Sequence, residues 1–408
     1  MQTIIAAFIA LSPWLIKQFK IIYLQLSNYY SMGPYSVMFI RITASFLYFF
    51  IPAGLIGGSF ILLFKLYARN LSMLGRQTSV IIGWFITGLA AGIIVYNFVL
   101  IRFFGIFYTS LLLAIIVIMI SLTMFALFLI DKQKQGILHK FGLKVRPHSD
   151  EYVITAIGKW KKRLLRFLLL SSFSMTSFII LWKRILTEFS DDKTIYFSTV
   201  LLFVFLLSLA SGNFLITPFI DKFRRKFTAI AVIQLIIGIT AFSALGIFIN
   251  IFPAFARLNE YVSWLSLLLK ESGLFLAVMF IPFCFTGCLI PLYVKTYAED
   301  IKTIGHKTGL IFLLIALGIC AAFYITSFIL IPILGIYKTY LLLILFHLGI
   351  GIFIFFRYRR IKSTVRIGSF LISAAIFIIF ILLFNEKKIS VLRDKNIKSG
   401  FLEKGIEG

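Results

Sequence analysis

Long apolar stretches dominate the chain, and charged residues lie mainly between them. Ten of these stretches contain no Asp, Glu, Lys or Arg. A helix of about 20 apolar residues crosses the hydrocarbon core of a bilayer. The pattern therefore predicts an all-α polytopic membrane protein with ten or eleven spans and no sheet. The stretches are 42–64, 77–101, 103–130, 167–182, 194–220, 227–256, 272–294, 308–337, 339–356 and 367–385, and the eleventh candidate is 3–25, which contains Lys17 and Lys20.

The composition agrees with a membrane protein and excludes several soluble classes. Hydrophobic residues make up 61% of the chain and charged residues 14%, whereas a soluble domain has about 45–50% and 25%. The net charge of +26 does not indicate nucleic-acid binding, because the basic residues lie in short loops between the apolar stretches. Cys284, Cys288 and Cys320 lie in apolar stretches without a CxxC pair or a nearby His, so no disulfide framework, metal site or cofactor is expected.

The distribution of Lys and Arg predicts the topology. Loops on one side of the predicted spans hold 25 basic residues, and loops on the other side hold seven. The positive-inside rule places the richer side and the amino terminus in the cytoplasm, as expected of a multi-pass protein of the inner or plasma membrane. We therefore expect the lipid bilayer to be a partner of this chain. Within the basic linker 131–166, residues 152–166 form either an interfacial helix anchored by Trp160 or a solvated connection.

An internal repeat appears when the chain is compared with itself at an offset of 230, which places Pro52 on Pro282. Composition bias aligns Leu with Ile freely, but it does not readily align several glycines, a proline, a lysine and a tyrosine. The repeat contains the pairs Pro52/Pro282, Gly57/Gly287, Lys65/Lys295, Tyr67/Tyr297, Gly75/Gly305, Gly88/Gly318 and Gly105/Gly335. Both copies have the same orientation across the membrane, which is the parallel-repeat arrangement of major facilitator transporters.

The repeat also predicts the domain organisation. Residues 1–130 form a first repeat of four helices, 131–166 a cytoplasmic basic linker, and 167–360 a second repeat of six helices. An extra helix at 361–385 and a polar tail at 386–408 follow. The first repeat is thus expected to be short by two helices. Small residues and a proline are expected at helix-packing positions, where backbones approach closely or bend; they are Gly57, Gly88, Gly287, Pro291 and Gly318.

Three stretches give the chain a likeness to a known family. The first is 172–186 with Trp182 and Arg184, the second is 197–226 with Asp221, Arg224 and Arg225, and the third is 281–335. Together they resemble the membrane region of fused proteins that join a major-facilitator-like domain to a spermidine-synthase-like domain. The resemblance implies an integral membrane protein for small-molecule transport, its substrate unknown. The alternative is a non-transporting anchor or scaffold for a separate or lost aminopropyltransferase-like protein.

Two departures from that family change what is expected of the chain. Ile179 stands where the family has an acidic residue before the Trp, which weakens any proton or cation role at that position. No Gly-rich nucleotide loop after a strand occurs, so these residues are not expected to be an enzyme. The tail 401–408 looks like the lead-in to a synthase domain.

Polar residues within the predicted spans are the candidate cavity residues, because polar groups are costly in hydrocarbon. Besides Arg41 and Gln234, they are Asn97, Asn213 and His347. His347 is either an interhelical hydrogen-bond donor or a proton carrier. No Asp or Glu is expected within the membrane, so polyamine binding there is not expected. The nearest acids are assigned to the outer surface; they are Asp191, Asp192, Glu260 and Glu271.

Two charged groups lie at the ends of predicted spans. Asp221 with Arg224 and Arg225 forms a cytoplasmic turn that either gates the inward face through ion pairs and a helix end or simply anchors the topology. Trp182 and Arg184 are expected at the outer interface, either in an aromatic belt or in a family-specific role.

The topology is open to cysteine-accessibility mapping. Single cysteines in the loops 65–76, 131–166, 221–226 and 295–307 are expected to react with a membrane-impermeant thiol reagent from one side only. The reason is the concentration of basic residues in these loops. Labelling of 131–166 and 221–226 from opposite sides would contradict the topology.

Overall fold

The computed structural model describes residues 1–29, 34–67, 72–140, 158–189, 195–223, 225–257, 263–298 and 303–357. Over these residues the chain is helical and contains no strand. The helices fall into two compact units, each formed by discontinuous parts of the chain. Unit 1 comprises residues 1–67 and 95–155, and unit 2 comprises 68–94 and 156–408.

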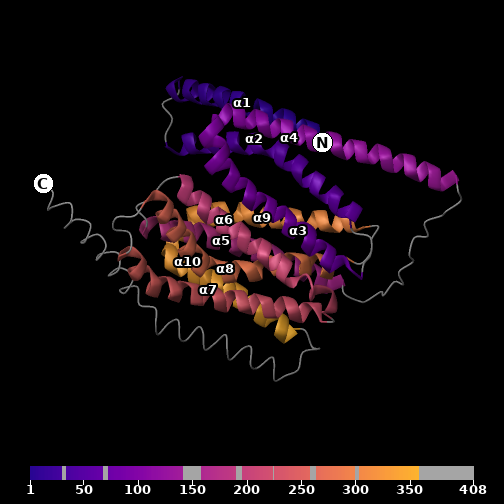
Figure 1. The fold of residues 1–408 in the computed structure, drawn as a ribbon. Helices are drawn as coiled ribbons and strands as arrows, with labels where there is room; N and C mark the ends of the chain where they lie inside the picture. Colours follow the sequence, from indigo (N-terminus) through magenta and orange to yellow (C-terminus); the bar gives the residue numbers. More distant parts are fainter. Residues whose placement is uncertain are drawn as a thin grey trace. The chain divides into compact units, whose positions relative to one another are not determined.

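Unit 1 is built from three long helices and one π-helical segment. These elements are α1 (Gln2–Tyr29), α2 (Pro34–Tyr67), η1 (Val95–Leu100) and α4 (Ile101–Lys140). Helix α1 packs mainly against α4 and also against α2 (Figure 1). Pro13 and Pro52 lie inside α1 and α2, where each removes one backbone hydrogen bond from the helix.

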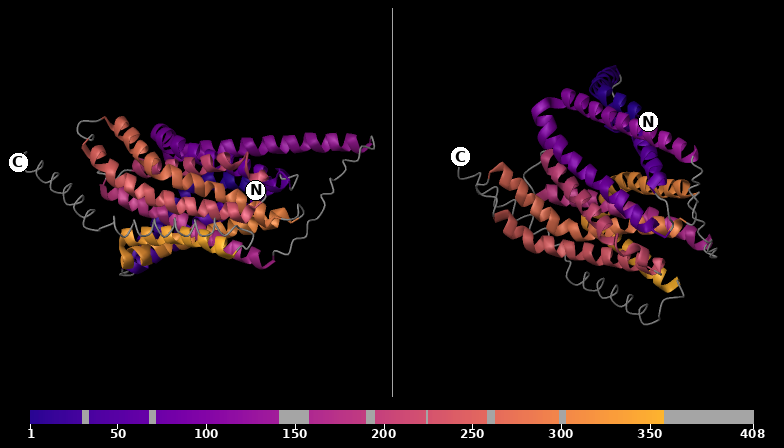
Figure 2. Two further views of the ribbon diagram at one scale, coloured as in Figure 1. Left: turned by 90° about the horizontal axis from the view of Figure 1, so that it is seen from below. Right: turned by 45° about the vertical axis from the view of Figure 1, so that its right-hand side comes forward.

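Unit 2 is a bundle of seven helices with two short connecting segments in its described part. Its elements are α3 (Leu74–Ile94), α5 (Gly158–Phe189), α6 (Ile195–Ile216), η2 (Ile220–Lys222), α7 (Lys226–Arg257), α8 (Trp264–Tyr297), α9 (Ile304–Ile325), η3 (Thr326–Leu330) and α10 (Ile331–Arg357). The closest pairs are α6 with α8 and α3 with α6, followed by α7 with α8, α10 with α7 and α5 with α9. In the views of Figures 1 and 2 these helices run side by side.

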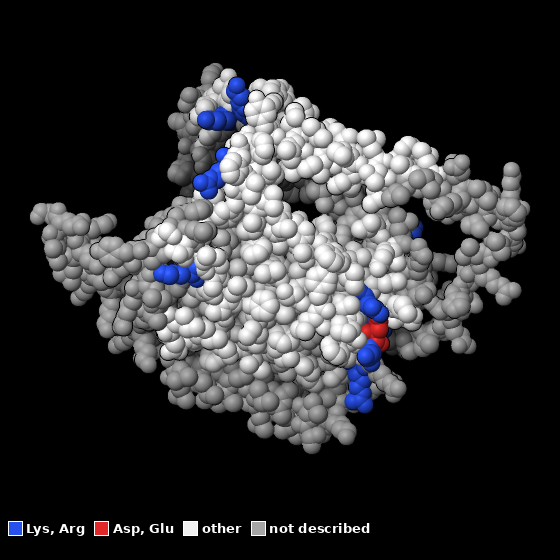
Figure 3. Space-filling model, in the orientation of Figure 1, with Lys and Arg blue, Asp and Glu red and all other residues white. Residues whose placement is uncertain are grey.

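The described helices are long and apolar enough for a membrane protein. Eight stretches qualify as membrane spans by length and hydropathy, and two of them, Leu74–Ala126 and Ile304–Phe356, are each 53 residues long. On the face drawn in Figure 3, uncharged side chains form nearly all of the described surface. A multi-pass helical membrane protein is therefore confirmed at this level, and its apolar surface is suited to lipid contact. The predicted span 367–385 lies outside the described residues.

Helices extend beyond the charge-free stretches that predicted them. Helix α5 begins at Gly158, so the basic residues up to Arg166 form its first turns. Helix α8 begins at Trp264, well before the stretch 272–294. Glu271 is consequently inside α8 and only 2% exposed, which corrects its predicted place at the outer surface. The absence of charge locates the hydrocarbon core, whereas helix ends are set by backbone hydrogen bonds and caps.

Two glycines turn the chain inside otherwise helical segments. Gly105 has φ 69° and ψ 175°, and Gly335 has φ 78° and ψ 170°. This backbone region is open essentially to glycine alone, because a Cβ atom would clash there. Each glycine follows a π-helical segment, η1 in the first case and η3 in the second. The two longest apolar stretches therefore each consist of two helical parts joined at a glycine.

The α6–α8 contact depends on two glycines that face the partner backbone. A Cβ atom at Gly212 of α6 would collide with the carbonyl group of Cys284 in α8. A Cβ atom at Gly287 of α8 would collide with the carbonyl group of Leu209 in α6. Backbones this close gain van der Waals contact, which drives helix association in lipid because burial of apolar surface contributes little there.

Replacing Gly287 by Ala is expected to destabilise unit 2. The added methyl group meets a backbone carbonyl that cannot rotate away, so we expect a cost of about 1–3 kcal/mol. The measurement is the thermal unfolding midpoint in detergent. Gly246→Ala in α7 is the matched control, because a Cβ atom there meets nothing within 4 Å. An equal midpoint for the two variants would contradict the close approach of α6 and α8.

Candidate functional site

The site begins with Asp221, which lies in η2 between α6 and α7. One carboxylate oxygen accepts a hydrogen bond from the backbone amide of Gly75 at 3.1 Å, and the other accepts from the amide of Arg76 at 3.0 Å. These amides belong to the first turn of α3, where backbone N–H groups have no acceptor within the helix. A carboxylate is favoured here also because a helix start carries a partial positive charge. Asp221 thus caps α3 from another part of the chain.

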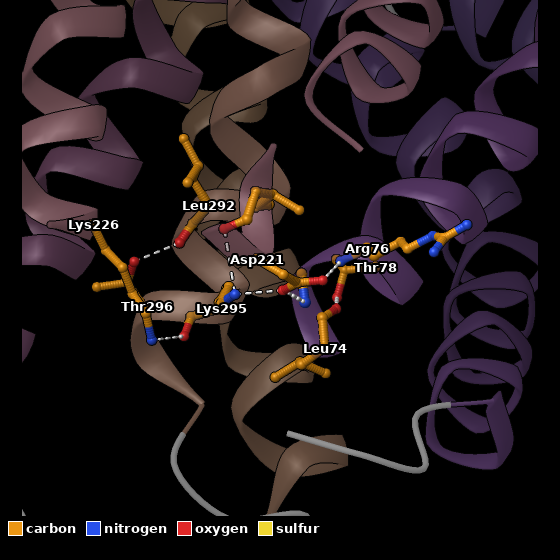
Figure 4. A network of polar contacts seen from close by, with 10 residues as sticks. Leu74, Arg76, Thr78, Asp221, Lys226, Leu292, Lys295 and Thr296 are labelled. Carbon is orange, nitrogen blue, oxygen red and sulfur yellow. Dashed lines mark hydrogen bonds and ion pairs between the residues drawn. The ribbon is translucent and has the colours of Figure 1, made fainter. Parts of the chain in front are cut away.

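Lys295, in the last turn of α8, completes the site. Its ammonium group forms an ion pair with Asp221, and it also donates to the backbone carbonyl of Ile220 at 3.3 Å. The Lys295 side chain is only 8% exposed, so it needs the charge of Asp221 to remain buried as a cation. Lys226, at the start of α7, donates to the carbonyl of Lys295 at 3.3 Å (Figure 4).

Gly75 is required by the tight packing of this group. A Cβ atom at this position would lie 2.7 Å from the Asp221 carboxylate and 2.8 Å from Cδ of Lys295. Glycine therefore lets the start of α3 approach both side chains at once. We call Gly75, Arg76, Asp221 and Lys295 the α3 clasp.

The clasp joins elements that are far apart in the sequence. Two hydrogen bonds from backbone amides connect α3 with η2, and the Asp221–Lys295 ion pair connects η2 with the end of α8. The two hydrogen bonds are broken if α3 moves away from η2 by a few ångströms, because hydrogen bonds weaken beyond about 3.2 Å. The arrangement is therefore suited to holding α3 reversibly. Among the described residues, no group of three His, Cys, Asp or Glu is placed to hold a metal ion.

A second polar group lies in the interior of unit 2. The Nε2 amide group of Gln234 (α7) donates to Ser171 Oγ (α5) at 2.6 Å and to Tyr293 Oη (α8) at 3.3 Å. The Gln234 Oε1 atom pairs with Nδ1 of His347 (α10) at 2.5 Å. All these side chains are buried. Four helices are thus connected by hydrogen bonds in an apolar interior, where unpaired polar groups are costly.

The Gln234 contact also assigns the donor at His347. Because Gln234 Oε1 is an acceptor, the ring donates from Nδ1–H. Within the described part of the chain, Nε2 is buried and has no hydrogen-bond partner. The ring of Phe178 stacks on the imidazole at 5.9 Å between centroids. His347 therefore acts as an interhelical donor in this structure, one of the two roles considered from the sequence.

The other polar and aromatic candidates are dispersed. Trp182 is 1% exposed and packs between the rings of Phe248 and Tyr340, so it lies inside the bundle rather than at its lipid-facing surface. Asn213 is buried in α6 and donates to the carbonyl of Leu209 at 2.9 Å. The remaining candidates are Arg184 and Arg225, which are exposed, Asn97, which lies in η1 of unit 1, and Arg224, which lies outside the described residues.

The candidate packing residues differ in their surroundings. Gly318 of α9 faces α5, and a Cβ atom there would lie 2.8 Å from Cβ of Ser172. Gly287 faces α6 in the same way, and Pro291 lies inside α8. At Gly57 and Gly88, by contrast, a Cβ atom meets nothing within 4 Å.

Sequence reasoning identified Asp221 but not its partners. Lys295 was named as a repeat position and counted as a basic loop residue, and Gly75 was named as a repeat position, but neither was connected with Asp221. Glu271 was missed as a buried acid because α8 starts earlier than its charge-free stretch. The available signal for Lys295 was its repeat pairing with Lys65, since a lysine kept at the same place in both copies suggests a shared structural need.

Comparison with known proteins gives no relative: no protein-family model, no curated protein and no solved structure matches the chain.

Removing the carboxylate is expected to loosen the start of α3. In Asp221→Ala the amides of Gly75 and Arg76 lose their acceptor, at a cost of about 1 kcal/mol or more for a cap, so their hydrogen exchange should rise by roughly tenfold. The measurement is hydrogen–deuterium exchange of peptides covering 74–81. Lys222→Ala, which changes an exposed neighbour in η2, is the control. Unchanged exchange in both variants would show that the clasp does not hold α3.

Proposed function

We propose that this chain is a transporter-like membrane protein with a major-facilitator-like arrangement, in which the α3 clasp controls access from the cytoplasmic side. The observation that carries the proposal is the cap that Asp221 places on the start of α3. In the proposed topology both Asp221 and Lys295 lie at the cytoplasmic ends of their helices. The substrate is a small molecule, and the proposal assigns no catalytic step to this chain.

The position of α3 supports a gating role. Along the chain α3 lies between α2 and α4 of unit 1, yet it packs against α6 and α8 of unit 2. A transporter that alternates between two open states needs a contact of this kind between its repeats, one that can form and break at small cost. The two amide hydrogen bonds from α3 to Asp221 meet that need, since each contributes only about 1–3 kcal/mol.

The recurrence of elements supports two parallel repeats. Helices α2 and α8 are both 34 residues long and end at Tyr67 and Tyr297, which are one repeat offset apart. Helices α3 and α9 begin at the same separation, so Gly88 and Gly318 have the same position within their helices. The positive-φ glycines, Gly105 and Gly335, have the same spacing. The packing of α1 against α4 has its counterpart in that of α7 against α10.

Transport is tested in everted membrane vesicles that contain the full chain. The vesicles are incubated with a panel of amino acids, sugars, nucleosides and diamines, and uptake is measured by mass spectrometry. We expect chain-dependent flux of at least one solute, changed by about tenfold in Asp221→Asn, since about 1.4 kcal/mol of lost clasp energy corresponds to that factor. Lys222→Ala should resemble the unchanged chain. Flux that is independent of the chain for every solute would refute transport.

One observation favours a second candidate, a non-transporting scaffold for a synthase-like protein. The buried polar side chains of unit 2 are bonded to one another through Gln234. Such a group makes the unit rigid, as a scaffold requires. The resemblance to fused synthase proteins supplies the partner class in this case. The absence of flux in the vesicle experiment, together with binding of a synthase-like protein, would favour the scaffold.

A further inference from the structure

A run of five buried hydroxyl side chains lies in α5 between Ser171 and Ser177. Three of them donate to the backbone carbonyl group four residues earlier, which is a common arrangement in a helix. Ser171 instead accepts from the amide group of Gln234. Ser174 is different, because its Oγ atom is buried and has no hydrogen-bond partner among the described residues. A buried hydroxyl group without a partner is costly, so this atom marks a place where a ligand is expected.

Ser174 lies on the face of α5 that meets His347. Three residues before it, Ser171 bonds to Gln234, whose Oε1 atom pairs with His347. Four residues after it, Phe178 stacks on the His347 ring, with an angle of 13° between the two ring planes. Residues three and four apart share one face of a helix. Ser174 therefore lies between two positions of α5 that both contact the Gln234–His347 pair.

His347 offers a second buried atom, from the neighbouring helix α10. Its Nδ1 atom is 2.5 Å from Oε1 of Gln234, so this side of the ring already has its partner. Its Nε2 atom is buried and has none in the described part of the chain. A neutral imidazole with its proton on Nδ1 is an acceptor at Nε2. Helices α5 and α10 pack together, and each thus contributes one buried polar atom that does not bond directly to the other.

We propose that one water molecule is bound between Ser174 and His347, where it accepts from the Ser174 hydroxyl group and donates to Nε2. The two atoms define this ligand, because it must accept at one side and donate at the other. Water does both, and it brings no charge into the bundle, where a charge would be costly. Two successive hydrogen bonds of about 2.8 Å through a water span atoms that are out of direct reach of each other.

The water completes a ring of hydrogen bonds that begins and ends on α5. The ring runs from Ser171 to Gln234 of α7, on to His347 of α10, and through the water to Ser174. It connects three helices of unit 2 and satisfies both remaining polar atoms. All of its side chains are buried in this unit, so the inference goes beyond the proposed function and does not rest on transport.

A crystal structure of the full chain in a lipidic phase, at a resolution that shows ordered waters, tests the proposal. We expect a density peak within hydrogen-bond distance of both Ser174 Oγ and the His347 ring. In Ser174→Ala the water keeps only one of these two partners, so we expect the peak to be lost. Ser177→Ala is the matched control, because it removes a hydroxyl group from the same helix that bonds to Thr326 instead. The peak should persist in this control.

Nitrogen NMR in lipid bilayers gives a second measurement that needs no crystal of a variant. The other three histidines are replaced by Gln in the full chain, so that the imidazole signals come from His347 alone; they are His139, His148 and His306. We expect a protonated Nδ1 and an unprotonated Nε2 that accepts a hydrogen bond. In Ser174→Ala the Nε2 resonance should shift toward that of a free imidazole nitrogen, and in Ser177→Ala it should not move.

Each outcome decides the matter. A bridging peak and an Nε2 shift that depend on Ser174 but not on Ser177 support the proposal. A direct contact between Ser174 and the ring, a peak that persists in Ser174→Ala, or no peak at all overturns it. A ring protonated at Nε2 overturns it as well, because the water would then have no acceptor there. The vesicle uptake experiment tests the proposed function independently of these results.

Discussion

The rest of the structure depends on the cost of an unpaired backbone amide or carbonyl in hydrocarbon. Each such group costs several kcal/mol without water, so every segment that crosses a bilayer must satisfy its own backbone. The described residues meet this constraint with helices alone. The constraint is weakest at helix ends, where the first amides have no partner within the helix, and the α3 clasp lies at such an end.

The same rule explains where the chain uses glycine. At Gly212 and Gly287 the absence of a side chain lets two backbones approach, and contact replaces the hydrophobic driving force that lipid cannot supply. At Gly105 and Gly335 glycine allows a turn between two helical parts. At Gly75 it makes room for a carboxylate and a lysine. One residue type therefore serves packing, turning and polar contact.

Much of the fold could be predicted from the sequence, because charge-free stretches report directly on the hydrocarbon core. The helix ends could not be predicted in this way. Helix α8 begins at Trp264, before its charge-free stretch, and Glu271 therefore lies in the interior. Asp221 could be named as an acid in a basic turn, but its partners could not. The bonds to Gly75 and Arg76 connect residues about 146 positions apart, and no local pattern encodes such a contact. Gln234 and His347 could be recognised from the sequence as polar residues in predicted spans. That they pair with each other depends on how α7 and α10 are oriented about their own axes, which the sequence pattern does not give.

The placement of α3 has a consequence for how the polypeptide can be divided. Unit 1 is interrupted by a helix that belongs to unit 2, so the chain passes between the units at residues 67–68 and 94–95 as well as at 155–156. No single cut separates two complete domains. A fragment ending before α5 carries α3 without the helices that cover one of its sides, and a fragment beginning at Gly158 keeps Asp221 and Lys295 with no helix start to bind. Neither half contains all the contacts of the α3 clasp, so we expect co-expressed halves to form it only by associating with each other.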